Sequence, residues 1–133
     1  MFGVAEYMSK HAEKYGCDAE EMYVLGLLHD IGYIYGAENH GKTGSILMQK
    51  LGYNDSEYIN WHDILPEDYK SMTHSKELPN KLRLLLTADL SVNSKGEDIG
   101  FDGRLEDIKT RYGEGSPQFK NVATTIAYLK KEN

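Results

Sequence analysis

Apolar side chains recur every three or four residues along most of the chain, which is the spacing of one face of an α-helix. In the first periodic segment, Val4, Met8 and Ala12 share a face, and Gly16 follows where a helix commonly ends. Short polar breaks separate one periodic segment from the next. The pattern predicts helices over residues 2–15, 18–30, 40–51, 55–65, 79–92, 102–112 and 116–129, with a polar loop over 67–77 that holds one helical turn at most.

Polar caps and prolines mark the expected helix ends. Asp18 has a glutamate three residues later, which is the signature of a capping box. Ser116 and Pro117 are typical of an N-cap and the first helical position. Asp102 is expected to cap the sixth helix, and Pro66 to close the fourth. On the third helix, the apolar residues Ile46, Leu47 and Leu51 are expected to face inward. These signals predict an all-α fold, a single bundle of six to seven helices.

Length and charge limit the classes of function. At 133 residues, the chain has the length of one domain, spanning 1–133. It carries 15 Lys and Arg against 21 Asp and Glu, a net charge of −6, which argues against duplex nucleic acid or an anionic membrane as a partner. No segment approaches the roughly 18–20 apolar residues of a membrane span. The single cysteine, Cys17, and the lack of an export signal predict a cytoplasmic protein.

Five side chains of metal-ligand type stand where the pattern predicts burial or a helix end. His29 and Asp30 directly follow an apolar run, and Asp89 lies in the most apolar helix. A buried carboxylate is costly unless it is paired or coordinated. His40 and His62 stand near the ends of two further helices. Imidazole and carboxylate are ligands for Fe, Mn, Ni, Co and Zn, and a carboxylate can bridge two ions. The sequence therefore predicts a site for one or two divalent transition-metal ions.

Structural interpretations of single residues stay open beside this one. Taken alone, His40 could cap its helix, and His62 could be a core histidine. His11 is expected to be a core or hydrogen-bonded residue, and His74 lies in the polar loop without an evident partner. Asp63, in a second His-Asp pair, is interpreted as a surface residue. The metal interpretation is favoured because the five ligand-type residues occur together.

A second motif offers a competing interpretation. Residues 36–43 match the G-x-x-x-x-G-K-[ST] pattern of a phosphate-binding loop, and residues 31–35 could form the strand before it. Such a loop requires a parallel sheet that delivers it to a helix N-terminus. The predicted helices leave no room for that sheet. A P-loop NTPase is therefore the weaker alternative, and a chance match in a glycine-rich turn is the simpler explanation.

Several segments together resemble the HD-domain superfamily of metal-dependent phosphohydrolases. The resemblance covers nearly the whole chain and rests on LLHDIG at residues 27–32, HGKTGSIL at 40–47, LGY at 51–53, INWH at 59–62, LLLTADL at 84–90 and RLEDI at 104–108. The two additional histidines make the chain similar to the YqeK-like, two-metal subgroup, which includes bacterial diadenosine-tetraphosphate hydrolases. The resemblance implies that His29, Asp30 and Asp89 form the catalytic core and hold one ion. It also implies that Asp30 bridges to a second ion held by His40 and His62.

The function implied by this resemblance is hydrolysis of a nucleotide or another small phosphate ester through a metal-activated water. Lys42, Arg104 and Arg111 are the candidate phosphate contacts, each with a surface or structural ion pair as the alternative. Tyr33 and Tyr35, beside the predicted ligands, are placed either to stack on a base or to pack. A homodimer is a further expectation for a small helical bundle.

The chain departs from the family pattern at its start. The family carries a further histidine four residues before the Val4-Ala5 pair, which here would fall one position before Met1. Either the site lacks one ligand or the first helix is truncated at its N-terminus. The alternative function is therefore a catalytically silent HD module that binds a metal or a nucleotide.

Overall fold

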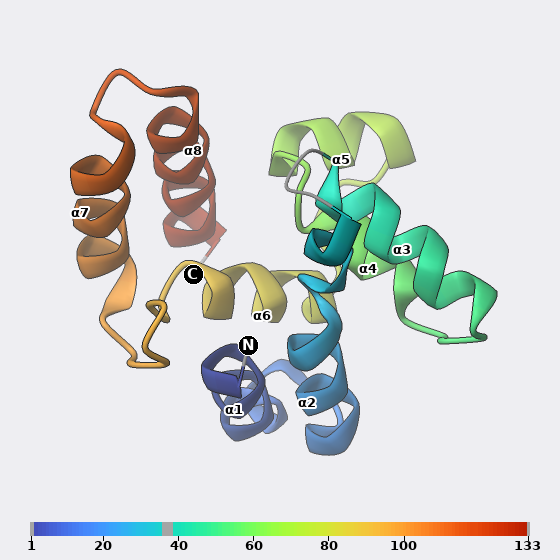
Figure 1. Cartoon of the computed structure of the whole chain (residues 1–133). Helices are drawn as coiled ribbons and strands as arrows, with labels where there is room; N and C mark the ends of the chain where they lie inside the picture. The colour runs from blue at the N-terminus through green and yellow to red at the C-terminus, as the bar shows by residue number, and fades with distance from the viewer. Residues whose placement is uncertain (1, 36–38, 133) are drawn as a thin grey trace.

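The computed structural model describes residues 2–35 and 39–132, and most of this part of the chain is helical (Figure 1). The predicted all-α class is confirmed. The described residues form eight α-helices and two short 3-10 helices: α1 (Phe2–His11), η1 (Glu13–Tyr15), α2 (Ala19–Leu28), η2 (Ile31–Tyr35), α3 (His40–Lys50), α4 (Ser56–Trp61), α5 (Pro66–Thr73), α6 (Asn80–Asp89), α7 (Gly100–Tyr112) and α8 (Pro117–Glu132). None of the described helices combines the length and the apolar character that a membrane crossing requires.

Helix α6 lies at the centre of the molecule, between the α7–α8 pair and helices α3 to α5, with α1 and α2 on a third side (Figure 1). Its residues enter two apolar clusters. Leu84 and Leu85 belong to the first, with Met8 of α1 and Met22 of α2. The second holds Leu82 and Leu86 of α6 with Tyr69 of α5 and Ile126 of α8. Because α6 is packed on both faces, residues 84–88 are buried without interruption, and the polar residues Asn80, Lys81 and Arg83 lie in its first half.

Helices α1 and α2 pack so closely that their contact admits no side chain at Gly26. A Cβ there would lie 2.6 Å from the Cα of Ala5, closer than real Cβ contacts allow. Gly26 is buried three residues before His29, so this contact fixes the C-terminal end of α2 against α1. The position of His29 therefore depends on backbone packing.

Two of the predicted caps are present and one is wrong. The Asp18 carboxylate accepts the Glu21 N–H at 3.0 Å, and the Ser116 hydroxyl accepts the Phe119 N–H at 3.1 Å. Helix α7 begins at Gly100, so Asp102 lies within its first turn and does not cap it. Asp98 instead accepts the Gly100 N–H at 3.1 Å, and this contact places the helix start earlier.

The segment predicted as a polar loop over residues 67–77 is a helix for most of its length, which raises the number of α-helices above the predicted six to seven. Pro66 does not only close the preceding segment: it occupies the first turn of α5, after Leu65 in an extended conformation. Helix α5 buries Pro66 and Tyr69 and leaves most of its other residues at the surface. Two buried residues are too few to produce a clear helical period in the sequence.

Helix α3 faces inward with residues other than the predicted ones. Ile46 is 44% exposed and Leu51 is 71% exposed. Its buried residues are His40, Gly41 and Gly44. This face packs against η2 and α4, where the small residues allow the backbones to approach closely. The prediction was wrong because the buried face of α3 is built from glycine and histidine instead of aliphatic residues.

Candidate metal centre

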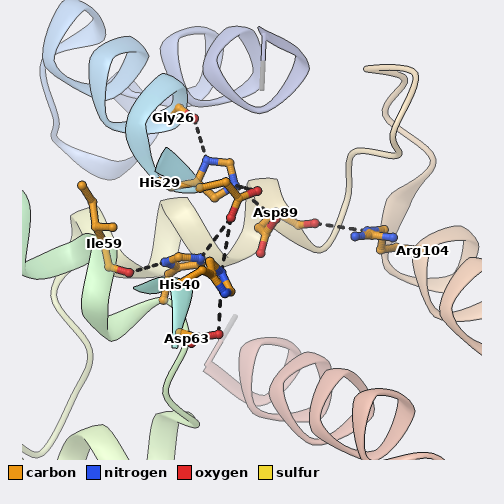
Figure 2. Close-up of polar contacts among 9 residues, drawn as sticks. Gly26, His29, His40, Ile59, Asp63, Asp89 and Arg104 are labelled. Carbon is orange, nitrogen blue, oxygen red and sulfur yellow. Dashed lines mark hydrogen bonds and ion pairs between the residues drawn. The ribbon is translucent and has the colours of Figure 1, made fainter. Parts of the chain in front are cut away.

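The five predicted ligand residues lie together, and each stands at or next to the end of a helix. His29 follows the last residue of α2, and Asp30 comes directly after it. His40 is the first residue of α3, His62 follows the last residue of α4, and Asp89 is the last residue of α6. Figure 2 shows the side chains of His29, His40 and Asp89 directed toward a common centre. Helices far apart in the sequence therefore contribute one cluster of imidazoles and carboxylates.

The Asp30 carboxylate stands between two groups of ligands. Its Oδ2 lies 3.1 Å from the Nε2 of His29, and its Oδ1 lies 3.4 Å from the Nε2 of His40 and 3.5 Å from that of His62. Asp89 approaches the same His29 Nε2 at 3.4 Å. Two sets of three, His29 with Asp30 and Asp89, and Asp30 with His40 and His62, each keep their ligand atoms within 4.8 Å of one another. Asp30 belongs to both and offers a different oxygen to each.

Backbone carbonyls orient two of the imidazole rings. The Nδ1 of His29 lies 2.6 Å from the Gly26 carbonyl oxygen, and the Nδ1 of His62 contacts the Ile59 carbonyl oxygen in the same way (Figure 2). A carbonyl can only accept, so each Nδ1 carries the proton. When the ring is neutral, its Nε2 lone pair is therefore directed at the carboxylates. Histidine ligands of metals are commonly oriented by such a contact at the second nitrogen.

The chemistry of this cluster fits a divalent transition-metal ion. The His29 side chain is 1% exposed, and its Nε2 has no hydrogen-bond partner of good geometry among the described residues. A buried polar atom without a hydrogen-bond partner is unusual in a folded protein. It faces two carboxylates, and imidazole with carboxylate is a ligand set of this class of ions.

The charged groups of the cluster strongly perturb one another. Burial alone would lower the pKa of His29, but contacts with the Asp30 and Asp89 carboxylates outweigh it and raise that pKa to about 10. Burial would raise the pKa of Asp30, yet His29 first, then His40 and His62, hold it well below its usual range. The pKa of Asp89 is also lowered, because the contact with His29 outweighs burial. In the ion-free protein, a proton on His29 therefore supplies the positive charge between these carboxylates.

The position of His40 depends on Gly32. A Cβ at residue 32 would lie 1.8 Å from the carbonyl oxygen of His40, so the η2 and α3 backbones are in direct contact. Tyr33, the next residue of η2, stacks on the His40 ring with centroids 4.0 Å apart and planes at 18°. The glycine and the tyrosine together fix where the first residue of α3 presents its imidazole.

A pocket of about 320 Å³ opens over the cluster. One wall contains Asp30, Tyr33, His40 and His62, from the segments that carry the ligands. The facing wall comes from α7 and α8. Its residues are Arg104, Ile108, Tyr112, Gln118, Asn121, Val122 and Thr125.

The three predicted phosphate contacts are placed differently. Arg104 lines the pocket, and its Nε donates to the backbone oxygen of Asp89 at 3.3 Å (Figure 2). Lys42 is exposed on α3, away from the buried face that carries His40, and it is not part of the described pocket lining. Arg111 is exposed near the end of α7 and is likewise absent from that lining. The structure thus brings one of the three cations to the site.

Asp63 is exposed, as predicted, and it also lies beside the cluster. Its side chain is 40% exposed, and its Oδ1 lies 3.8 Å from the Nε2 of His40. The second His-Asp pair in the sequence was the signal that could have identified it. His11 and His74 lie outside the two ligand groups: His11 contacts the Tyr7 carbonyl at 2.9 Å, and His74 follows α5 with a positive φ of 56°.

The structure contradicts the strand that the P-loop interpretation requires. Residues 31–35 form the 3-10 helix η2, and among residues 2–35 and 39–132 the only β pairing is a single bridge between Val92 and Asp98. Residues 36–38 of the motif lie outside the described residues. Because no strand precedes the motif, residues 31–35 do not provide the strand that a P-loop requires, and the P-loop interpretation is not supported.

Comparison with protein families places this site in a known class. The family model for the HD domain matches residues 1–92 of the chain, which contain all five candidate ligand residues. Neither the search of curated proteins nor the search of solved structures returned a match. The matched residues cover more than half of the chain and end before α7, so the α7–α8 wall of the pocket follows them in sequence. The chain, with its paired histidines and aspartates at converging helix ends, belongs to the HD-domain family.

Proposed function

We propose that this protein is a metal-dependent phosphohydrolase that acts on a nucleotide or another small phosphate ester. One observation carries the proposal: two ligand groups share Asp30 at the base of a pocket of about 320 Å³. HD domains are generally metal-dependent hydrolases, and the ligand residues lie within the matched segment. Nucleotide hydrolysis is the finer part of the proposal, and the similarity of His40 and His62 to the two-metal subgroup supports it.

Each residue of the cluster has a distinct part in this function. His29, Asp30 and Asp89 would hold one ion, and Asp30, His40 and His62 would hold a second. A bound divalent ion polarises a phosphoryl oxygen and lowers the pKa of water. The Gly26 and Ile59 carbonyls keep the Nε2 atoms of His29 and His62 directed at the centre. Arg104, which reaches the same pocket, contacts the phosphate and offsets its charge.

Metal binding and hydrolysis are best tested on the same preparation. The chain is stripped with a chelator, reloaded with Mn²⁺, Co²⁺, Ni²⁺, Zn²⁺ or Fe²⁺, and analysed for metal content and for phosphate release from a panel of nucleotides and simple esters. We expect two bound ions per chain and hydrolysis with at least one metal. We expect His62→Ala to retain one ion, because it leaves the group of His29, Asp30 and Asp89 complete.

The matched control is His74→Ala, because His74 is exposed at the end of α5 and outside both ligand groups. His29→Ala is expected to lose the ions and the hydrolysis, whereas the control retains both. A folded His29→Ala variant that hydrolyses esters as fast as the control would overturn the proposal. Metal binding without hydrolysis of any ester in the panel would instead identify a silent metal-binding HD module.

A further inference from the structure

The wall of the pocket opposite the ligand cluster has its own chemical character. It is formed by α7 and α8, which follow the segment matched by the family. Helix α8 presents Gln118, Asn121 and Thr125 to the pocket at intervals of three and four residues. These side chains are polar but uncharged. Arg104 is the one lysine or arginine among the described lining residues. It contacts the backbone of Asp89, at the metal side of the pocket, and the C-terminal end of α7 adds no lysine or arginine to the lining.

Two tyrosines line this pocket from different segments. Tyr33 is contributed by η2 and is 49% exposed, and Tyr112 is the last residue of α7 and is 47% exposed. Ligand pockets are lined predominantly by hydrophobic and aromatic side chains. One face of Tyr33 is covered by His40. Tyr112 stacks on no other described aromatic ring.

The distribution of charge determines which part of a ligand fits each wall. Three aspartates, Asp30, Asp63 and Asp89, line the metal side of the pocket, where bound ions would attract a phosphate group. The α7–α8 wall offers aromatic and amide side chains together with a single guanidinium. A chain of several phosphates would need further cations along this wall. At about 320 Å³, the pocket is near the lower end of the range for small-molecule sites.

We propose that Tyr33 and Tyr112 receive the flat, uncharged ring of a ligand of the nucleoside monophosphate class, with Gln118 and Asn121 available to its polar edge. This inference rests on the proposed function only in placing the phosphate at the ligand cluster. Stacking on an aromatic side chain is sequence-tolerant, because every base has a π-face. The two tyrosines thereby favour ligands that carry a base over ligands that lack one, and Tyr112 belongs to neither ligand group.

The test compares two ligands that differ only in the base. Non-hydrolysable phosphonate analogues of adenosine monophosphate and of ribose 5-phosphate are titrated calorimetrically into the Mn²⁺-loaded protein. We expect the adenosine analogue to bind roughly 10- to 100-fold more tightly than the ribose analogue. In Tyr112→Leu this preference is expected to fall to about threefold or less. Tyr112→Phe keeps the ring and retains the preference, as does the control Tyr23→Leu, at a residue outside the pocket lining.

The outcomes separate this inference from the proposed function. Equal affinity for the two analogues, or an unchanged preference in Tyr112→Leu, overturns the role of the tyrosine. If esters are hydrolysed but the preference is absent, the phosphohydrolase function stands and this inference fails. If the preference is present and depends on the Tyr112 ring while no ester is hydrolysed, the inference stands as a binding property and the hydrolytic function fails.

Discussion

Replacing Gly32 with alanine tests whether the site depends on the direct contact between η2 and α3. The added Cβ would lie 1.8 Å from the His40 carbonyl oxygen and 2.7 Å from its carbonyl carbon. Real Cβ atoms essentially never come closer than 3.0 Å to such atoms, so the two backbones must separate by about 1.2 Å. The clashing atoms are backbone atoms, and no side-chain rotation can relieve the contact.

Both stability and metal affinity are expected to fall in Gly32→Ala. Overpacking of a buried contact costs about 1–3 kcal/mol in the free energy of unfolding, and a backbone clash places this variant near 3 kcal/mol, or about 100-fold in the folded-to-unfolded ratio. His40 begins α3, so the separation also moves its Nε2 relative to the Asp30 Oδ1, now 3.4 Å away. Binding constellations tolerate displacements of only about 0.5 Å, so we expect the affinity of the second ion to fall at least tenfold.

Urea unfolding of the ion-free protein, followed by circular dichroism, measures the stability loss, and calorimetric titration with Mn²⁺ measures the affinity. Gly115→Ala is the matched control, because a Cβ there meets no atom within 4 Å and no left-handed backbone angle is required. We expect the control to remain within about 0.5 kcal/mol of the parent protein. If Gly32→Ala unfolds at the same urea concentration as Gly115→Ala, the argument from backbone contact is wrong.

Three further predictions address the proton on His29, the cations and the core. The raised pKa of His29, about 10 in the ion-free protein, means that an ion must displace its proton. Mn²⁺ affinity is therefore expected to rise roughly tenfold per pH unit between about pH 7 and 9, with about one proton released per ion. Calorimetry in buffers of different ionisation enthalpy measures the number of protons released. An affinity that stays constant above neutral pH would contradict the prediction. The same group stabilises the ion-free fold fully below its ordinary pKa of 6.5, and this contribution is lost as pH rises through about 10. Arg104→Ala is expected to weaken binding of inorganic phosphate to the Mn²⁺-loaded protein about tenfold, whereas Lys42→Ala and Arg111→Ala stay within about twofold; an equal loss in Lys42→Ala would refute the placement of the phosphate. Leu85→Ala, at a fully buried position, is expected to cost about 2–5 kcal/mol in urea unfolding without changing the number of ions bound.

The candidate ligand residues could be picked out because they conflict with their local sequence, and the structure brings them together. Asp89 directly follows the buried residues 84–88 of α6, and His29 with Asp30 follows an apolar run, where unpaired polar groups are costly. Helix breaks beside His40 and His62 further indicated that these residues stand near element ends. The sequence therefore contained the chemistry of the cluster, together with the all-α class, before any distance was known.

Other features depend on tertiary contacts that no local pattern records. Helix α5 buries only two residues, so hydrophobic periodicity did not predict it. The inner face of α3 consists of glycine and histidine, so the same periodicity indicated the wrong face of that helix. The position of Tyr112 in the pocket follows from how the α7–α8 pair sits against α6. Asp63 looked like a surface residue because it is one: its role beside His40 comes from the direction of its side chain.

The proton held by His29 has a consequence for the biogenesis of the protein. In the ion-free chain, an imidazolium 3.1 Å from Asp30 and 3.4 Å from Asp89 already compensates the carboxylates that would otherwise repel each other. We therefore expect the ion-free polypeptide to fold, unlike small domains whose folding requires the ion. Under the proposed function, metal acquisition would then be an exchange of a proton for an ion in the folded protein, and the ion that enters would depend on the metals available to it.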